Sequence, residues 1–266
     1  MFRPRIIPVL LLKNNGLVKT INFRDPNYIG DPMNAVRIFN EFEADELVIL
    51  DIDASKENRT ISKDIVHQIA EEAFMPFAVG GGIQTIDQIR DILNEGVEKV
   101  ILNTAAYKNP KLIQEASMIF GGQSIVVSID VKLNSEGNYK VFIGGGDEEV
   151  DVDLIEYVKQ IDSLGAGEIM ITSIDKDGTM KGYDNELVKI VSENVSMPVI
   201  ACGGAGDLED FSEVINVGQA SAAAAGSVWF VLAFRQHRSY TSNAAQASGN
   251  NCCPIKNKSR IKGVEA

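Results

Sequence analysis

The strongest constraint on the fold is a strict alternation of two residue patterns along the chain. Short runs that are almost wholly apolar alternate with longer stretches that carry apolar residues at helical spacing. The apolar runs predict eight strands, at 5–12, 46–52, 77–79, 99–102, 124–131, 168–172, 199–201 and 220–225. Continuous apolar strands are typical of a parallel sheet that is covered on both faces.

The stretches between these strands predict helices, and several begin with the Ser, Asp, Asn or Pro that commonly start one. They lie at 31–43, 62–73, 85–95, 110–119, 153–164, 185–194 and 208–217. Eight strands and at least seven helices in alternation predict a (β/α)8 TIM barrel. An open, doubly wound sheet is the alternative.

The two halves of the chain resemble each other at an offset of about 120 residues. A glycine turn at 80–82 follows the third strand, and a second one at 203–206 follows the seventh. Such a turn before a helix lets backbone N–H groups approach a phosphate, although a single glycine turn is more often only a turn. Two copies predict two phosphate sites that face each other across the C-terminal mouth of the barrel.

A carboxylate, Asp130, stands at the end of the fifth apolar strand, where barrel enzymes carry their catalytic residues. A cap or a salt bridge to Lys132 is the structural alternative. The internal repeat places the counterpart of Asp130 at Leu11. Leucine cannot exchange a proton, so no carboxylate pair is present to divide acid and base work.

Composition excludes some classes of partner and predicts a cellular compartment. The chain has 266 residues, 45% of them hydrophobic, and a net charge of −12, which argues against nucleic acid and anionic membranes as partners. No long apolar run or signal peptide is recognised, and three cysteines make no disulfide framework, so a cytoplasmic protein is expected. Cys202 has no nearby base and is interpreted as a buried thiol.

No cluster has metal-ligand spacing, and neither a metal nor a cofactor is expected. Residues 1–240 are predicted to form a single barrel. Residues 241–266 are rich in Ser, Ala and Asn and then basic, which predicts a disordered tail, with a basic recognition tail as the alternative.

Several motifs, in order along about residues 3–230, resemble the cyclase subunit family of imidazole glycerol phosphate synthase. They include Arg5-Ile6-Ile7-Pro8, Leu50-Asp51-Ile52, Val79-Gly80-Gly81-Gly82-Ile83, Asn103-Thr104-Ala105-Ala106, Asp177-Gly178-Thr179 and Gly203-Gly204-Ala205-Gly206. In that family a separate glutaminase subunit releases ammonia, which crosses the barrel to the active site at the opposite mouth. The resemblance implies a lyase-type synthase subunit with a glutaminase partner at its N-terminal face.

The resemblance also implies roles for individual residues. It assigns the catalytic role to Asp130 and an ammonia gate to Arg5, Glu46, Lys99 and Glu168. Without the resemblance, these four residues would be interpreted as surface ion pairs. The resemblance further implies that a phosphorylated or nucleotide-linked substrate is bound by Lys19, Asp51, Gly82, Asn103, Thr104, Asp177, Gly178, Gly204, Gly226 and Ser227.

The chain departs from the family at Leu11, where the first of two catalytic aspartates belongs, and in the acidic stretch 144–149. Both departures favour a paralogous branch, which works with a glutaminase-like partner and an ATP-dependent amidotransferase to place acetamidino groups on surface sugars. The histidine-pathway cyclase is the first alternative, and a barrel that only activates its glutaminase is the second. A sugar-phosphate isomerase is less favoured, because it needs no charged ring.

Overall fold

The computed structural model describes residues 3–227 of the chain. Its first half contains β1 (Arg5–Lys13), β2 (Gly16–Ile21), β3 (Arg24–Gly30), α1 (Pro32–Glu41), β4 (Leu47–Asp51), α2 (Lys63–Glu72), β5 (Phe77–Gly80), α3 (Ile86–Asn94), β6 (Lys99–Leu102), α4 (Thr104–Lys108) and α5 (Lys111–Phe120). A short 3-10 turn, η1 (Gly122–Ser124), precedes the second half, which contains β7 (Ile125–Leu133), β8 (Tyr139–Ile143), β9 (Glu148–Val150), α6 (Leu154–Ser163), β10 (Glu168–Ser173), α7 (Asn185–Ser192), β11 (Val199–Cys202), α8 (Leu208–Asn216) and β12 (Ala222–Ala225).

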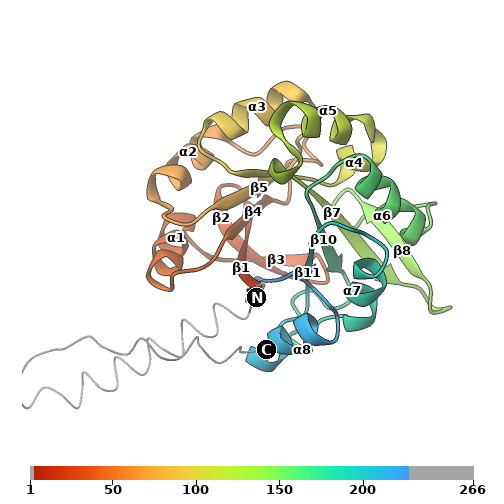
Figure 1. Ribbon diagram of the computed structural model, residues 1–266. Coiled ribbons are helices and arrows are strands. Elements are labelled where there is room, and N and C mark those ends of the chain that lie inside the picture. The colour runs from red at the N-terminus through yellow and green to blue at the C-terminus, as the bar shows by residue number, and fades with distance from the viewer. Residues whose placement is uncertain (1–2, 228–266) are drawn as a thin grey trace, which may run out of the picture.

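Eight parallel strands form a closed barrel, in the order β1, β4, β5, β6, β7, β10, β11 and β12. The pairing of β7 with β10, from Val126 opposite Glu168 to Val131 opposite Ser173, joins the two halves of the chain. The helices surround the strands (Figure 1). The predicted TIM barrel is confirmed, and the open sheet is excluded because the strands between β1 and β12 leave no free edge.

Each barrel strand sends alternate side chains to two separate apolar clusters, because successive residues of a strand point to opposite faces. On β1, Ile7 and Val9 lie in the interior cluster, and Leu11 packs against it. Leu10 and Leu12 pack instead in the larger cluster between the sheet and the helices. The face of β1 that carries Leu11 is therefore the face that lines the bore.

Polar side chains start most of the long helices by accepting the free backbone N–H groups of the first turn. Such caps are formed by Asp31, Thr85, Asp153, Asp184 and Asp207. The observed helices lie within the predicted ranges and are one to three residues shorter, except α5, which ends one residue later than predicted, at Phe120. The last strand is also shorter than predicted, 222–225 in place of 220–225.

The sequence patterns miss two antiparallel hairpins, β2–β3 and β8–β9, and the short helix α4. These strands are partly exposed at the barrel mouth, so they lack the continuous apolar runs of the barrel strands. Within residues 3–227 no helix has the length and apolarity needed to cross a membrane. The predicted tail at 241–266 lies outside the described residues.

The cap of α3 yields a test of local stability. The Thr85 hydroxyl accepts the Gln88 N–H at 3.3 Å, and the Gln88 side chain accepts the Thr85 N–H at 3.1 Å. Thr85→Ala removes the first bond and should lower the free energy of unfolding by about 1 kcal/mol. Thr85→Ser keeps the hydroxyl and should remain close to wild type in the same urea titration. Equal losses in the two variants would contradict a capping role.

Candidate active site

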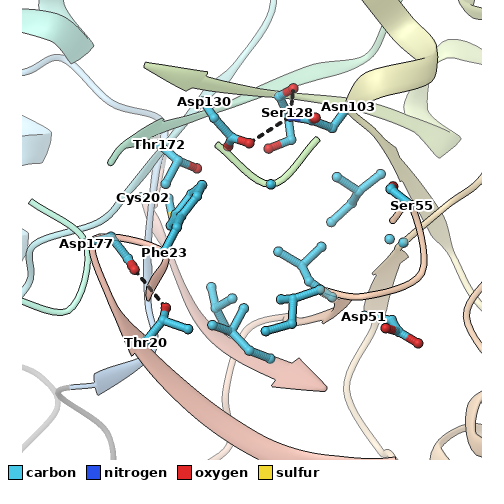
Figure 2. Close-up of a pocket in the computed structure, with 18 of the residues that line it drawn as sticks. Thr20, Phe23, Asp51, Ser55, Asn103, Ser128, Asp130, Thr172, Asp177 and Cys202 are labelled. Atoms are coloured by element: carbon cyan, nitrogen blue, oxygen red, sulfur yellow. Dashed lines mark hydrogen bonds between the residues drawn. The ribbon is translucent and has the colours of Figure 1, made fainter. Parts of the chain in front are cut away.

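A cavity of about 510 Å³ opens at the C-terminal ends of the barrel strands. All of the substrate and catalytic positions predicted from the sequence line it, namely Leu11, Lys19, Asp51, Gly82, Asn103, Thr104, Asp130, Asp177, Gly178, Gly204, Gly226 and Ser227. Figure 2 shows Asp130, Thr172, Cys202 and Asp177 along one side of this cavity, with Asp51 on the opposite side. The fold therefore gathers positions from both halves of the chain around one volume.

Asp130 is buried on β7, and Asn103 holds it in place. The Asn103 side-chain amide donates to Asp130 Oδ2 at 3.0 Å and to the Ser128 carbonyl oxygen at 3.0 Å. Burial raises the pKa of Asp130 to about 7; the hydrogen bond from Asn103 opposes this rise, and the charge of Asp177 adds to it. A carboxyl group with a pKa near neutrality can both accept and donate a proton at physiological pH. Among the described residues Asp130 forms no salt bridge with Lys132, so that structural alternative is not observed.

Asp177 is a second carboxylate of perturbed acidity in the same cavity. The Thr20 hydroxyl donates to Asp177 Oδ2 at 3.1 Å, and the backbone N–H of Phe23 is a further donor. Burial raises the pKa of Asp177 to about 6, and these two hydrogen bonds moderate the rise. Like charges that share a site disfavour ionisation, and the charge of Asp177 accordingly raises the pKa of Asp130.

The β1 side of the cavity is apolar around position 11, while Lys13, farther along the same strand, pairs with Asp53. Leu11 lies there beside Val9, Val18 and Leu50, all of which line the cavity. No titratable atom stands at position 11 to face Asp130. The carboxyl groups that can exchange a proton, those of Asp130 and Asp177, therefore lie on the β7 and β10 side of the cavity.

Asp51 lines the cavity, but its oxygens already have partners. Arg59 donates to Asp51 Oδ2 at 2.5 Å, and the backbone N–H groups of Asp53 and Ala54 donate to Asp51 Oδ1 at 3.1 Å each. The hydrogen bond to Asp51 also raises the pKa of Arg59. The structure thus gives Asp51 a clear task, which is to shape the loop that follows β4.

Close backbone packing accounts for glycine at several of the predicted phosphate positions. A Cβ on Gly82 would lie 1.8 Å from the Arg59 carbonyl oxygen, and one on Gly178 would lie 2.1 Å from that of Thr20. Gly82 and Gly204 also have left-handed φ values, 66° and 114°. These glycines are required by the fold whatever the ligand.

Four charged residues form a closed ring of salt bridges at the other end of the bore, where β1, β4, β6 and β10 begin. Arg5 lies 2.6 Å from Glu46 and 2.8 Å from Glu168. Lys99 lies 2.8 Å from Glu46 and 3.1 Å from Glu168. Each cation therefore bridges both anions, and the ring carries no net charge.

The ring is largely shielded from solvent. The Glu46 side chain is 4% exposed and that of Lys99 is 15% exposed. Burial alone would lower the pKa of Arg5, but the negative charges of Glu168 and Glu46 and their hydrogen bonds raise it overall. Buried charges are tolerated when they are paired in this way. The sequence placed these residues near strand starts, and the structure brings all four into contact.

The interior cluster fills the bore between the ring and the cavity. It is wholly apolar and consists of Ile7, Val9, Val48, Ala78, Ile101, Val126, Met170, Ile200, Ala222 and Ala224. Strand alternation connects the two ends, because Arg5 and Leu11 lie on the same face of β1, as do Glu168 and Thr172 on β10. A bore filled with apolar side chains disfavours an isolated charge within it.

Sequence patterns missed several cavity residues. Thr20 and Phe23 belong to the unpredicted β2–β3 hairpin, and Phe23 points into the cavity (Figure 2). Ser128 could have been found, because it lies two residues before Asp130 and shares its face. Burial raises the pKa of Cys202 to about 12, with the charge of Asp177 contributing, so this residue is a neutral thiol. Residues 3–227 contain no cluster of three or more potential metal ligands.

Comparisons with known proteins place these features in a family. A family model described as histidine biosynthesis protein matches residues 5–235. A Pseudomonas aeruginosa protein provisionally named imidazole glycerol phosphate synthase subunit hisF2 is 46% identical, over 86% of this chain and 91% of its own length. The imidazole glycerol phosphate synthase subunit HisF of Alkaliphilus metalliredigens is 44% identical over the same shares.

A third relative, from Vibrio vulnificus, is provisionally named imidazole glycerol phosphate synthase subunit hisF3. It is 47% identical over 86% of this chain and 88% of its own length. HisF proteins and the numbered forms are thus equally similar to this chain, so identity alone does not choose between them. The matches cover the whole barrel, and the chain belongs to the histidine biosynthesis protein family, among the HisF subunits of imidazole glycerol phosphate synthase and their numbered relatives.

Proposed function

We propose that this barrel is the synthase subunit of a glutamine amidotransferase, which receives ammonia through its bore and adds it to a substrate at Asp130. The observation that carries this proposal is the geometry of the bore. A neutral ring of buried ion pairs stands at one end, a cavity with a carboxyl group of near-neutral pKa stands at the other, and a wholly apolar stretch lies between them.

The ring and the apolar stretch support the transfer of ammonia rather than ammonium. Arg5, Glu46, Lys99 and Glu168 occupy the entry with balanced charge, and an ammonium ion would have to leave water to pass the apolar residues beyond them. The names of the relatives describe subunits of a synthase. A glutaminase subunit docked at the N-terminal face, against this ring, is the partner that such an entry requires.

At the C-terminal mouth, the carboxyl groups that can transfer a proton lie on one side of the cavity only. Asn103 orients Asp130, and the near-neutral pKa of Asp130 suits it to move the proton that ammonia loses on addition. Leu11 removes a second proton-transfer group from the opposite wall. We therefore favour a paralogous amidotransferase that modifies surface sugars over the histidine-pathway cyclase, which divides the work between two aspartates.

A further candidate is a barrel that activates its glutaminase without chemistry of its own. The loss of a carboxylate at position 11 favours this candidate. The retained Asp130, with its dedicated partner Asn103 and its raised pKa, favours catalysis.

Substitution of Leu11 separates the two pathways. With ammonium salt and the ribulosyl-formimino nucleotide substrate, the native chain should form no measurable imidazole glycerol phosphate. Leu11→Asp restores a second proton-transfer group and should raise the rate by about 10²- to 10⁴-fold. Leu11→Asn has a similar size and polarity but cannot exchange a proton, so it should remain inactive. Efficient turnover by the native chain would instead assign it to the histidine pathway.

The ring can be tested in the Leu11→Asp background. Lys99→Met removes the cation that bridges Glu46 and Glu168. Turnover driven by glutamine through the glutaminase partner should fall about tenfold or more, because the two buried carboxylates then lose one of their two cations at the proposed entry. Turnover driven by added ammonium should change little, since ammonia then enters from solvent at the open mouth. A parallel fall in both rates would show that the ring is only structural.

The raised pKa of Asp130 predicts a pH-dependent stability. The native state retains this proton up to about pH 7, whereas an unfolded aspartate releases it near pH 4. Between these values the native state binds more protons, so the free energy of unfolding falls as the pH rises. Asp130→Asn has no such proton to lose. Its free energy of unfolding, relative to that of wild type, should therefore rise by up to about 4 kcal/mol between about pH 4 and pH 8.

Urea titrations of wild type and Asp130→Asn across this pH range measure the difference directly. Asp151 is exposed, and Asp151→Asn serves as the matched control for the loss of one carboxylate. A constant difference for Asp130→Asn would mean that the carboxyl group titrates alike in the folded and unfolded states.

A further inference from the structure

The turn between β8 and β9, residues 144–147, lies at the cavity mouth, and together with Glu148, the first residue of β9, it is called here the acidic turn. Its Gly144 N–H donates to the Thr104 hydroxyl oxygen at 3.1 Å, and Gly145 lines the cavity. A Cβ on Gly146 would lie 2.9 Å from the Phe23 ring, which itself points into the cavity (Figure 2). The turn thus extends from Thr104 to the β2–β3 hairpin.

Two carboxylates of the acidic turn form ion pairs with lysines that line the cavity. Lys56 Nζ lies 2.6 Å from Asp147 Oδ2, and Lys108 Nζ lies 3.8 Å from Glu148 Oε2. Lys56 belongs to the loop after β4, and Lys108 ends α4. The cations at this end of the cavity are therefore already neutralised by the protein.

The backbone conformation of the acidic turn depends on three successive glycines. Gly144, Gly145 and Gly146 have φ values of 67°, 74° and 83° in succession. Three consecutive left-handed residues are readily adopted only by glycine. The glycines reverse the chain at once after β8, which places Asp147 and Glu148 opposite the two lysines.

The opposite end of the cavity differs in charge. Gly178, Gly204, Gly226 and Ser227 line the cavity there. Lys19 also lines the cavity and precedes Thr20, whose carbonyl oxygen would lie 2.1 Å from a Cβ on Gly178. Within the described part of the chain, Lys19 forms no salt bridge. A phosphate at that end meets a free cation, whereas a phosphate near Thr104 meets lysines that already have anionic partners.

We infer that the acidic turn restricts the substrate to one phosphorylated end. The substrate carries a phosphate or diphosphate group at the Gly178 end and an uncharged polar group at the Thr104 end. This inference rests on the proposed function, since it concerns the same cavity. The ion pairs of Lys56 and Lys108 are exposed and individually weak, but the two carboxylates together cancel the positive charge of the two lysines, so an incoming phosphate dianion gains little attraction at this end.

Calorimetric titration of the full chain with ribulose 1,5-bisphosphate and ribulose 5-phosphate tests this selection. Neutralising the turn with Asp147→Asn and Glu148→Gln together should tighten binding of the bisphosphate about tenfold, and more at low salt. Binding of the monophosphate should change less than about twofold, because its phosphate occupies the distant end. A bisphosphate affinity that does not change, or an equal gain for both probes, would overturn the inference.

Glu149→Gln is the matched control. Glu149 follows Glu148 on β9 and points to the opposite face of the hairpin, so the same loss of charge should leave the affinity for both probes close to wild type. A gain as large as that of the double variant would show that total charge, and not the turn, is responsible. Failure of every variant to bind either probe would count against the proposed function as well, whereas tight monophosphate binding with an inert turn would overturn this inference alone.

Discussion

Pairing of β7 with β10 is the interaction on which the rest of the structure depends. It closes the barrel, and its register sets Asp130 beside Thr172, which is in turn paired with Cys202 on β11. The same closure brings Glu168 within reach of Arg5 and Lys99 at the opposite end. One set of backbone hydrogen bonds therefore fixes both the charged ring and the cavity that holds Asp130, and strand alternation keeps them on one bore.

Charge is distributed along this bore in a physically consistent order. The ring of Arg5, Glu46, Lys99 and Glu168 is neutral, because two cations are paired with two anions. The middle of the bore is apolar. The C-terminal mouth holds carboxyl groups whose pKa values are raised toward neutrality by burial. Each zone avoids an isolated buried charge. This order is the basis of the proposal that a neutral nucleophile crosses the bore and loses its proton at Asp130.

The features that separate this chain from a symmetric two-phosphate enzyme lie around the mouth. Leu11 makes the β1 wall apolar, and the acidic turn neutralises Lys56 and Lys108 near Thr104. Both changes break the equivalence of the two half-barrels while leaving the barrel itself intact. Asp130 and Lys19 line other parts of the same cavity.

Sequence alone determined the barrel and its glycine turns, since alternating apolar runs and helical patterns depend only on local periodicity and burial. It also marked Asp130 and Leu11, because strand ends are readable from the chain. Tertiary structure decided which side chains remain free for a ligand. Asp51 is held by Arg59, Asn103 is directed at Asp130, and polar hairpins without a local signal close the mouth. Those outcomes depend on contacts between residues distant in the chain, which no local pattern encodes.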